Sequence, residues 1–277
     1  MPLTFTPEIW SAQMLVSLKK NLVYGQTGVV NRDYEGEISG QGDTVRIRSI
    51  SRPTISSYTK NGTLTYETLT DAERALLIDQ AKSFSFVVDD IDTAQQPGGA
   101  LDAATMEASY ALRDQADQYI VGLYTGAQAA NQIGTVSVTT SALAFTQIRR
   151  LMVKLDEANV PQEGRWCVVP PWYYGLLLES DLFLRADASS APGLRNGVVG
   201  SVLGMDVMKS NNAPLVTGDD YAVMAGYGGA ITFAEQIVEM ETLRLQTTFG
   251  TGVRGLYVYG AKLVRPDSIA TVIASIT

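Results

Sequence analysis

Histidine is absent from the 277-residue chain, and cysteine occurs once. The absence of histidine removes the commonest general base, the usual partner of serine and cysteine nucleophiles, and the commonest transition-metal ligand. The lone Cys167 excludes an intrachain disulfide framework and a zinc site built on several cysteines. Its neighbours in the run RWCVV predict a buried strand, so we expect an inert core thiol.

Long apolar runs and basic clusters are also missing. The chain contains no run of about 18 apolar residues, the length that would predict a membrane span. The N-terminal MPLTFTPEIW lacks the pattern of a secretory signal, so we expect cytoplasmic synthesis. Acidic residues number 29 against 21 lysines and arginines, a formal charge of −8. Tight sequence-independent binding to phosphate backbones depends on clustered cations, so the charge argues against it. An acidic balance suits a protein that encloses nucleic acid without adhering to it.

The motifs of common enzymes are missing as well. Glycine-rich stretches at 197–204, 226–229 and 250–252 do not follow a phosphate-loop pattern, and turns explain them. Asp89 and Asp90 point to opposite faces of a predicted strand, which disfavours a cation site. No GxSxG elbow is present. We therefore predict no catalytic residue, no cofactor and no metal.

The most prominent predicted element is a helix over 100–124. Apolar residues recur on one side at helical spacing, while charged residues, Asp114 and Asp117 among them, supply the polar positions. Several alanines favour the helix and keep it thin. A thin, half-polar helix of this length suits a scaffold better than a catalytic centre.

Residues 44–79 predict a long two-stranded hairpin. The stretch 44–50 alternates apolar and polar residues, 54–71 has little hydrophobic density, and 74–79 resumes a strand. Lys60 stands beside Asn61-Gly62 at the expected tip. An intersubunit isopeptide bond at Lys60 is one interpretation, and a lysine that keeps the edge soluble is the favoured one. Because an isolated hairpin is marginal in water, we expect a partner surface.

The other predicted elements complete an α+β chain. We expect an N-terminal arm at 1–40 with a short amphipathic helix, and this arm has too few apolar residues to hold itself together. Helices are predicted at 142–158 and 172–183, and a polar loop at 187–200. Strands are predicted at 82–91, 166–169, 202–207, 237–246, 255–264 and 268–276.

Several short motifs stand in a characteristic order. GDTV at 42–45 enters the hairpin, YETLTD at 66–71 lies on its return limb, and FSFVVDDID follows at 84–92. Further along come LDEANVP at 155–161, VVPP at 168–171 and SNN at 210–212. In these motifs and in the order of its parts, the chain resembles the major capsid proteins of tailed bacteriophages.

The resemblance implies the Hong Kong phage-type capsid fold, which encapsulins and herpesvirus capsid floors share. It implies an N-terminal arm at 1–40, an extended hairpin loop at 41–80 and an inserted axial α/β domain at 131–235. A peripheral domain would comprise 81–130 and 236–277, with the spine helix at 100–124.

The resemblance also implies a function. It implies a non-enzymatic major capsid protein that assembles as hexamers and pentamers into an icosahedral shell around double-stranded phage DNA, without sequence-specific binding. The implied partners are copies of the same chain, a separate scaffolding protein and a portal, with a decoration protein left open. Assembly would occur in the cytoplasm of the bacterial host, and the final location would be the virion capsid.

Intersubunit contacts are expected in the arm, in the hairpin and in the loop at 187–200, which would face the capsomer centre. The candidate residues are Trp10, Leu15, Arg46, Arg48, Tyr58, Lys60, Tyr66, Glu67 and Arg195. Two alternatives stay open. An encapsulin-like compartment would form shells around cargo proteins, and a hydrolase without histidine would be a monomer or dimer whose activity depends on a few acidic residues.

Overall fold

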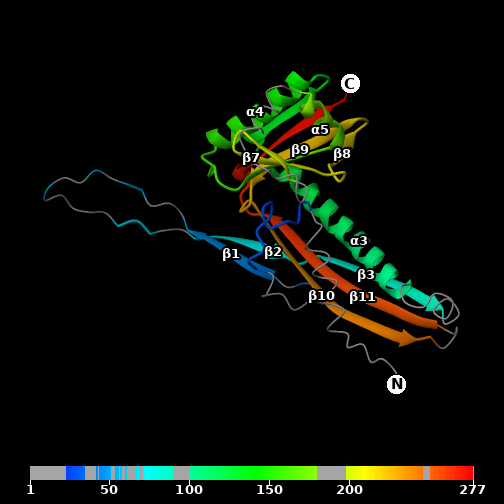
Figure 1. The fold of residues 1–277 in the computed structure, drawn as a ribbon. Coiled ribbons are helices and arrows are strands. Elements are labelled where there is room, and N and C mark those ends of the chain that lie inside the picture. Colours follow the sequence, from blue (N-terminus) through cyan, green and yellow to red (C-terminus); the bar gives the residue numbers. More distant parts are fainter. Residues whose placement is uncertain are drawn as a thin grey trace.

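The computed structural model describes residues 23–34, 42, 44–50, 54–55, 57, 60, 66–68, 71–89, 100–179, 198–245 and 250–276. Two bodies and a projecting ribbon make up this part of the chain (Figure 1). One body is a long helix lying along a three-stranded sheet, and the other is a seven-stranded sheet with two helices. The mixture of helix and sheet agrees with the predicted α+β class.

The three-stranded sheet is antiparallel in the order β10 (Ile231–Arg244), β11 (Gly250–Leu263) and β3 (Gln80–Asp89). The helix α3 (Ala100–Val121) lies along it and continues into the 3-10 turn η2 (Gly122–Gly126), close to the predicted 100–124. Leu112, Ala116 and Ile120 of α3 are buried in one core with aromatic residues of the sheet. This pattern confirms the apolar side predicted for the helix.

The seven-stranded sheet runs β4-β12-β9-β5-β7-β6, and β8 pairs with β9. Two of its pairs, β4 with β12 and β5 with β7, are parallel. The helices α4 and α5 pack on the core beside this sheet, and 3-10 turns η3 and η4 flank β4 and β12. The bounds are β4 (Gln132–Ser137), α4 (Ser141–Glu157), β5 (Arg165–Val169), α5 (Pro171–Leu178), β6 (Val198–Val202), β7 (Met205–Lys209), β8 (Leu215–Thr217), β9 (Asp220–Tyr227), β12 (Ile269–Ser275), η3 (Ala129–Asn131) and η4 (Pro266–Ser268).

Strand β5 joins the two cores. All five of its residues are buried. Cys167 and Val169 pack with α4 and α5, while Trp166 and Val168 pack in the core that contains α3. Because successive side chains of a strand point to opposite faces, a single strand serves both cores. The prediction of a buried strand at this place is confirmed.

The ribbon consists of β1 (Thr44–Ile50) and β2 (Asp71–Leu77), paired antiparallel from Thr44 opposite Leu77 to Ile50 opposite Asp71. Its base packs on the three-stranded sheet through Val45, Leu76 and Ile78. The two backbones come very close there, because a Cβ added at Gly260 of β11 would lie 2.5 Å from the Leu77 carbonyl oxygen. The predicted hairpin is confirmed, and its base is anchored on its own chain.

Some predictions differ from the structure. Strand β12 pairs with β4 and β9, so residues 269–275 belong to the seven-stranded sheet and not with β10 and β11, as the grouping 236–277 supposed. The strand predicted at 202–207 is the hairpin of β6 and β7, in which Leu203 and Gly204 both have positive φ. Residues 198–200 belong to β6 rather than to a loop, and α5 ends at Leu178.

Candidate functional site

The part of the ribbon beyond its paired strands carries apolar side chains with almost no cover. Ile55 is 93% exposed and Tyr66 is 92% exposed. A cross-limb hydrogen bond runs from the Thr54 amide to Glu67 Oε2 at 2.9 Å. Figure 1 shows the ribbon projecting away from both bodies. Exposed large apolar groups on a projecting element are typical of a contact surface that becomes buried in an assembly.

The predicted contact residues are distributed as follows. Arg46 is exposed on β1, Arg48 stands opposite Glu73 in the ribbon, and Lys60, Tyr66 and Glu67 are exposed beyond the paired strands. The structure thus brings five of the nine candidates onto one projecting element. Trp10, Leu15, Tyr58 and Arg195 lie outside the described residues.

Residues 23–34 are fastened to the body of their own chain, which corrects the prediction of a coreless arm for this part of 1–40. Tyr24, Val29 and Val30 are fully buried. Asn31 forms a parallel bridge with Thr232 at the edge of β10. The local sequence has too few apolar residues to form a core of its own. Residues of α3, β10 and β11 supply the rest of the core in which Tyr24, Val29 and Val30 are buried.

A buried ion pair forms the first polar anchor of this segment. Arg32 pairs with Glu235, whose side chain is fully buried, and Glu235 also accepts a hydrogen bond from the Tyr257 hydroxyl. The Arg32 guanidinium donates to the Gly25 carbonyl oxygen at 2.9 Å and lies 5.1 Å from the centre of the Phe233 ring. Burial is the main cause that raises the pKa of Tyr257 well above its ordinary value, and the nearby Glu235 raises it further.

Asp117 of α3 forms the second anchor. Its Oδ1 accepts hydrogen bonds from the backbone amides of Tyr24 at 3.0 Å and Gly25 at 3.4 Å. Its Oδ2 accepts from the Asn212 side-chain amide at 3.3 Å. Asp117 is only 3% exposed, and burial raises the pKa of this carboxyl from 3.8 to about 6, although the three hydrogen bonds lower it. Asp117 is one of the polar positions predicted for the helix, and the structure places it in the interior.

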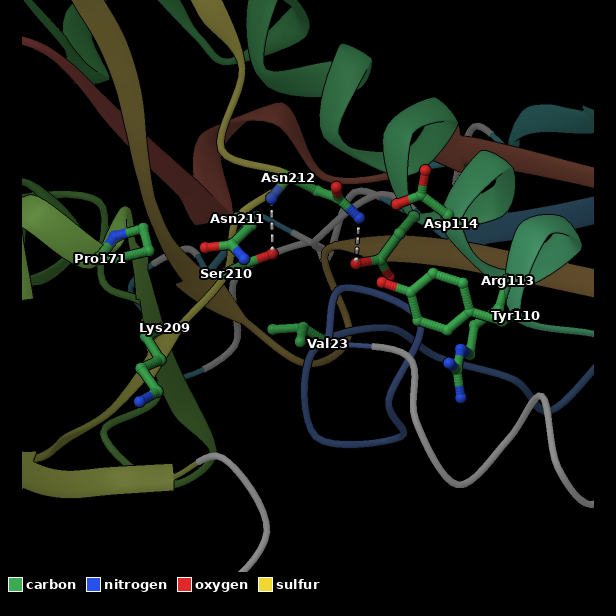
Figure 2. Close-up of a pocket in the computed structure, with 10 residues that line it drawn as sticks. Val23, Tyr110, Arg113, Asp114, Pro171, Lys209, Ser210, Asn211 and Asn212 are labelled. Carbon is green, nitrogen blue, oxygen red and sulfur yellow. Dashed lines mark hydrogen bonds between the residues drawn. The ribbon is translucent and has the colours of Figure 1, made fainter. Parts of the chain in front are cut away.

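A cavity of about 380 Å³ adjoins this anchor. Figure 2 shows Tyr110, Arg113 and Asp114 of α3 on one side and the turn that carries Ser210, Asn211 and Asn212 on the other, with Lys209 further along. The Asn212 backbone amide donates to Ser210 Oγ at 3.1 Å, which fixes the turn. The motif SNN at 210–212 thus helps to hold the two bodies together.

The remaining chemistry of the described residues is sparse. Burial raises the pKa of the Cys167 thiol to about 12, as an inert core thiol requires. Within the described ranges, no cluster of three or more acidic, histidine or cysteine residues could hold a metal. None of the helices in those ranges is long and apolar enough to cross a membrane.

Sequence reasoning missed both buried acids. For Glu235 a signal existed, since it follows Ile231 and Phe233 at alternate positions and so shares their core face. For Asp117 the sequence carries no such signal, because its hydrogen-bond donors lie 93 and 95 residues away.

Comparison with known proteins identifies the family of this chain. A family model described as phage capsid protein matches residues 72–272. The chain belongs to the phage capsid protein family. A solved structure from Mycobacterium phage Che8 shares 32% sequence identity with this capsid protein, covers 91% of each chain and has a TM-score of 0.72. The capsid structure of cyanophage P-SCSP1u shares 20% identity over 94% of this chain and 90% of that chain, with a TM-score of 0.69. No curated protein sequence matches.

An encapsulin complex from Synechococcus elongatus is similar in fold alone, at 8% identity and a TM-score of 0.57 over 87% of this chain and 85% of that chain. The capsid fold of the Hong Kong phage type and the function of major capsid protein, both expected from the sequence, are confirmed. A protein of this family is a structural component of the virion capsid.

Proposed function

We propose that this capsid protein assembles with copies of itself, as hexamers and pentamers, into an icosahedral shell that encloses double-stranded phage DNA. The exposed end of the ribbon supports this proposal most directly, because Ile55 and Tyr66 have no cover on their own chain. A second copy of the chain would bury them, and each copy would offer the same ribbon to its neighbour. Many such contacts in a closed shell convert modest pairwise affinities into a durable particle.

The other parts of the proposal follow from this arrangement. The ribbon with Arg46, Arg48, Tyr58, Lys60, Tyr66 and Glu67 forms one contact surface, Trp10 and Leu15 a second, and Arg195 lies near the capsomer centre. The protein acts as a structural subunit rather than an enzyme and is assembled in the host cytoplasm. A separate scaffolding protein and a portal complete the particle. The net charge of −8 favours a lining that encloses DNA without holding it tightly.

The test is a paired substitution at the ribbon end. Ile55→Ser together with Tyr66→Ser removes the two large apolar side chains that are most exposed among the described residues. We expect loss of closed shells in electron micrographs and a shift of the light-scattering mass from megadaltons to small species, with the scaffolding protein supplied. A matched control is Leu215→Ser, which removes a 58% exposed apolar residue from β8.

Two results would count against the proposal. Normal shells from the ribbon variant would show that the ribbon end is not a contact surface. Wild-type shells that contain cargo protein instead of DNA would favour an encapsulin-like compartment.

Lys60→Ala tests whether subunits of the shell are joined covalently through this lysine. We expect its shells to survive and to give monomers on denaturing gels, as the wild type does.

A further inference from the structure

One row of α3 residues faces the place where the N-terminal segment reaches the helix. Met106, Tyr110, Arg113 and Asp117 follow one another at steps of three or four residues, so they lie along one side of α3. We call this row the outer stripe. Tyr110, Arg113 and Asp117 line the cavity of about 380 Å³ together with Val23 (Figure 2). The outer stripe therefore passes directly beside the first described residue of the N-terminal segment.

The outer stripe becomes more exposed with distance from this point. Asp117 is 3% exposed, Tyr110 is 56% exposed and Met106 is 69% exposed. In the other direction α3 is covered, because Ile120 and Val121 are buried in the core. The stripe thus offers two large apolar side chains, one helical turn apart, that stay largely uncovered in the described part of the chain. Such a pair fits the apolar face of a second amphipathic helix.

The chain before residue 23 starts from the covered end of the outer stripe. The backbone amides of Tyr24 and Gly25 donate to Asp117, and the Gly25 carbonyl oxygen accepts from Arg32. These bonds hold both residues against the body of the chain, so the preceding residues are tethered beside α3. The uncovered part of the outer stripe runs from there toward Met106.

The sequence of the preceding residues matches the outer stripe in spacing and in length. An amphipathic helix is predicted there, and Met14 and Leu18 are four residues apart on it. Met106 and Tyr110 have the same separation on α3. A helix over 9–18 spans about 15 Å, and the outer stripe is about as long. Because this helix has too few apolar residues to form a core of its own, it needs an apolar surface.

The charges on the two sides are complementary as well. Lys19 and Lys20 come shortly before Val23. Asp114 borders the outer stripe and lines the same cavity as Asp117. Within the described ranges, neither acid forms an ion pair with a lysine or an arginine. Two cations of the N-terminal segment would therefore stand beside two acids that attract them.

We propose that the helix predicted over 9–18 packs along the outer stripe of its own chain. Leu18 lies against Tyr110, and Met14 lies against Met106. The short tether to the anchored backbone gives the chain's own stripe a high effective concentration, which favours it over the same stripe on a neighbouring copy.

This packing leaves part of the N-terminal helix for other contacts. Leu15 lies about 100° round the helix from Met14, and Trp10 lies one turn earlier, past the end of the outer stripe. Both side chains thus stay available to a neighbouring copy. The inference concerns contacts within one chain, so it goes beyond the proposed assembly and does not depend on it.

Paired cysteines test the packing on the full-length chain. Leu18→Cys combined with Tyr110→Cys should form a disulfide under mild oxidation, because bridging requires Cα atoms within about 7 Å of each other. The native Cys167 is buried and does not compete. The matched control combines Leu18→Cys with Ala111→Cys, at an exposed position about 100° round α3 from Tyr110. We expect the control to give about tenfold less disulfide.

Mixing isotope-labelled and unlabelled chains before oxidation shows in which chain the bond forms. Packing on the chain's own stripe gives linked peptides that are wholly labelled or wholly unlabelled in mass spectra. Peptides of mixed label in a statistical share would place the helix on a neighbouring copy and overturn the proposal. Equal yields from Tyr110→Cys and Ala111→Cys would also overturn it, as would the absence of a disulfide from both.

Trypsin provides a second measurement on chains without added cysteines. We expect slow cleavage after the two adjacent lysines of the N-terminal segment while the chain is folded. Met106→Ser together with Tyr110→Ser should speed this cleavage about tenfold, because the helix loses its apolar contacts. The matched control, Leu143→Ser with Val153→Ser, removes two exposed apolar residues from α4 and should leave the rate unchanged. Equal rates in the two double variants would contradict the packing.

Discussion

Removing the Arg32 side chain would break the ion pair that fastens residues 23–34 to β10 and β11. The Arg32 side chain is 9% exposed and that of Glu235 is fully buried. Arg32→Ala therefore leaves a carboxylate in the core without its cation, and it also removes the donor to the Gly25 carbonyl. Loss of one partner of a buried pair costs about 3–5 kcal/mol, and we expect the free energy of unfolding to fall by that amount.

Urea unfolding followed by tryptophan fluorescence measures the loss, with assembly state held constant. The matched control is Arg254→Ala, because Arg254 and Glu241 pair across the same two strands but are 62% and 35% exposed. An exposed pair is worth less than about 1 kcal/mol. The double variant Arg32→Ala with Glu235→Gln should recover part of the loss, since no charge remains to be buried. Equal costs for Arg32→Ala and Arg254→Ala would refute the reasoning.

Three further changes test other features of the structure. Gly260→Ala should cost about 1–3 kcal/mol in urea unfolding, because its Cβ would meet the Leu77 carbonyl at 2.5 Å, whereas Gly252→Ala, with no contact closer than 3.4 Å, should cost less. Leu203→Asn should raise thermal stability by roughly 1 kcal/mol, because Leu203 has φ 54° and is 37% exposed; no gain would contradict the strained turn. Cys167, with its pKa raised to about 12 by burial, should stay unmodified by a thiol reagent at about pH 8 until the chain unfolds, and rapid native labelling would contradict its burial.

Periodicity over a few residues was enough to predict several of the helices and strands. The helix α3, the strand β5 and the ribbon of β1 and β2 all follow from periodicity over a few residues, and each lies where it was expected. The exposed ribbon end was also foreseeable, since 54–71 offers little that could form a core.

Contacts between distant residues could not be predicted in the same way. Strand β12 is apolar enough for either sheet, and only its pairing with β4 and β9 decides between them. Asp117 has the spacing of a surface residue, and its burial results from amides on two remote segments. The turn at Leu203 was missed because leucine is unusual at positive φ. Glycine or asparagine at this position would have predicted a hairpin.

The place of β12 between β4 and β9 bears on how the chain folds during synthesis. Strands β4 and β9 lie on either side of β12, and β4 is complete well over a hundred residues before β12 is made. Until residues 269–275 leave the ribosome, both flanking strands present unpaired edges that invite misassociation. A chain cut short before residue 269 would therefore retain these edges, and incomplete products of translation would be kept from reaching the native form.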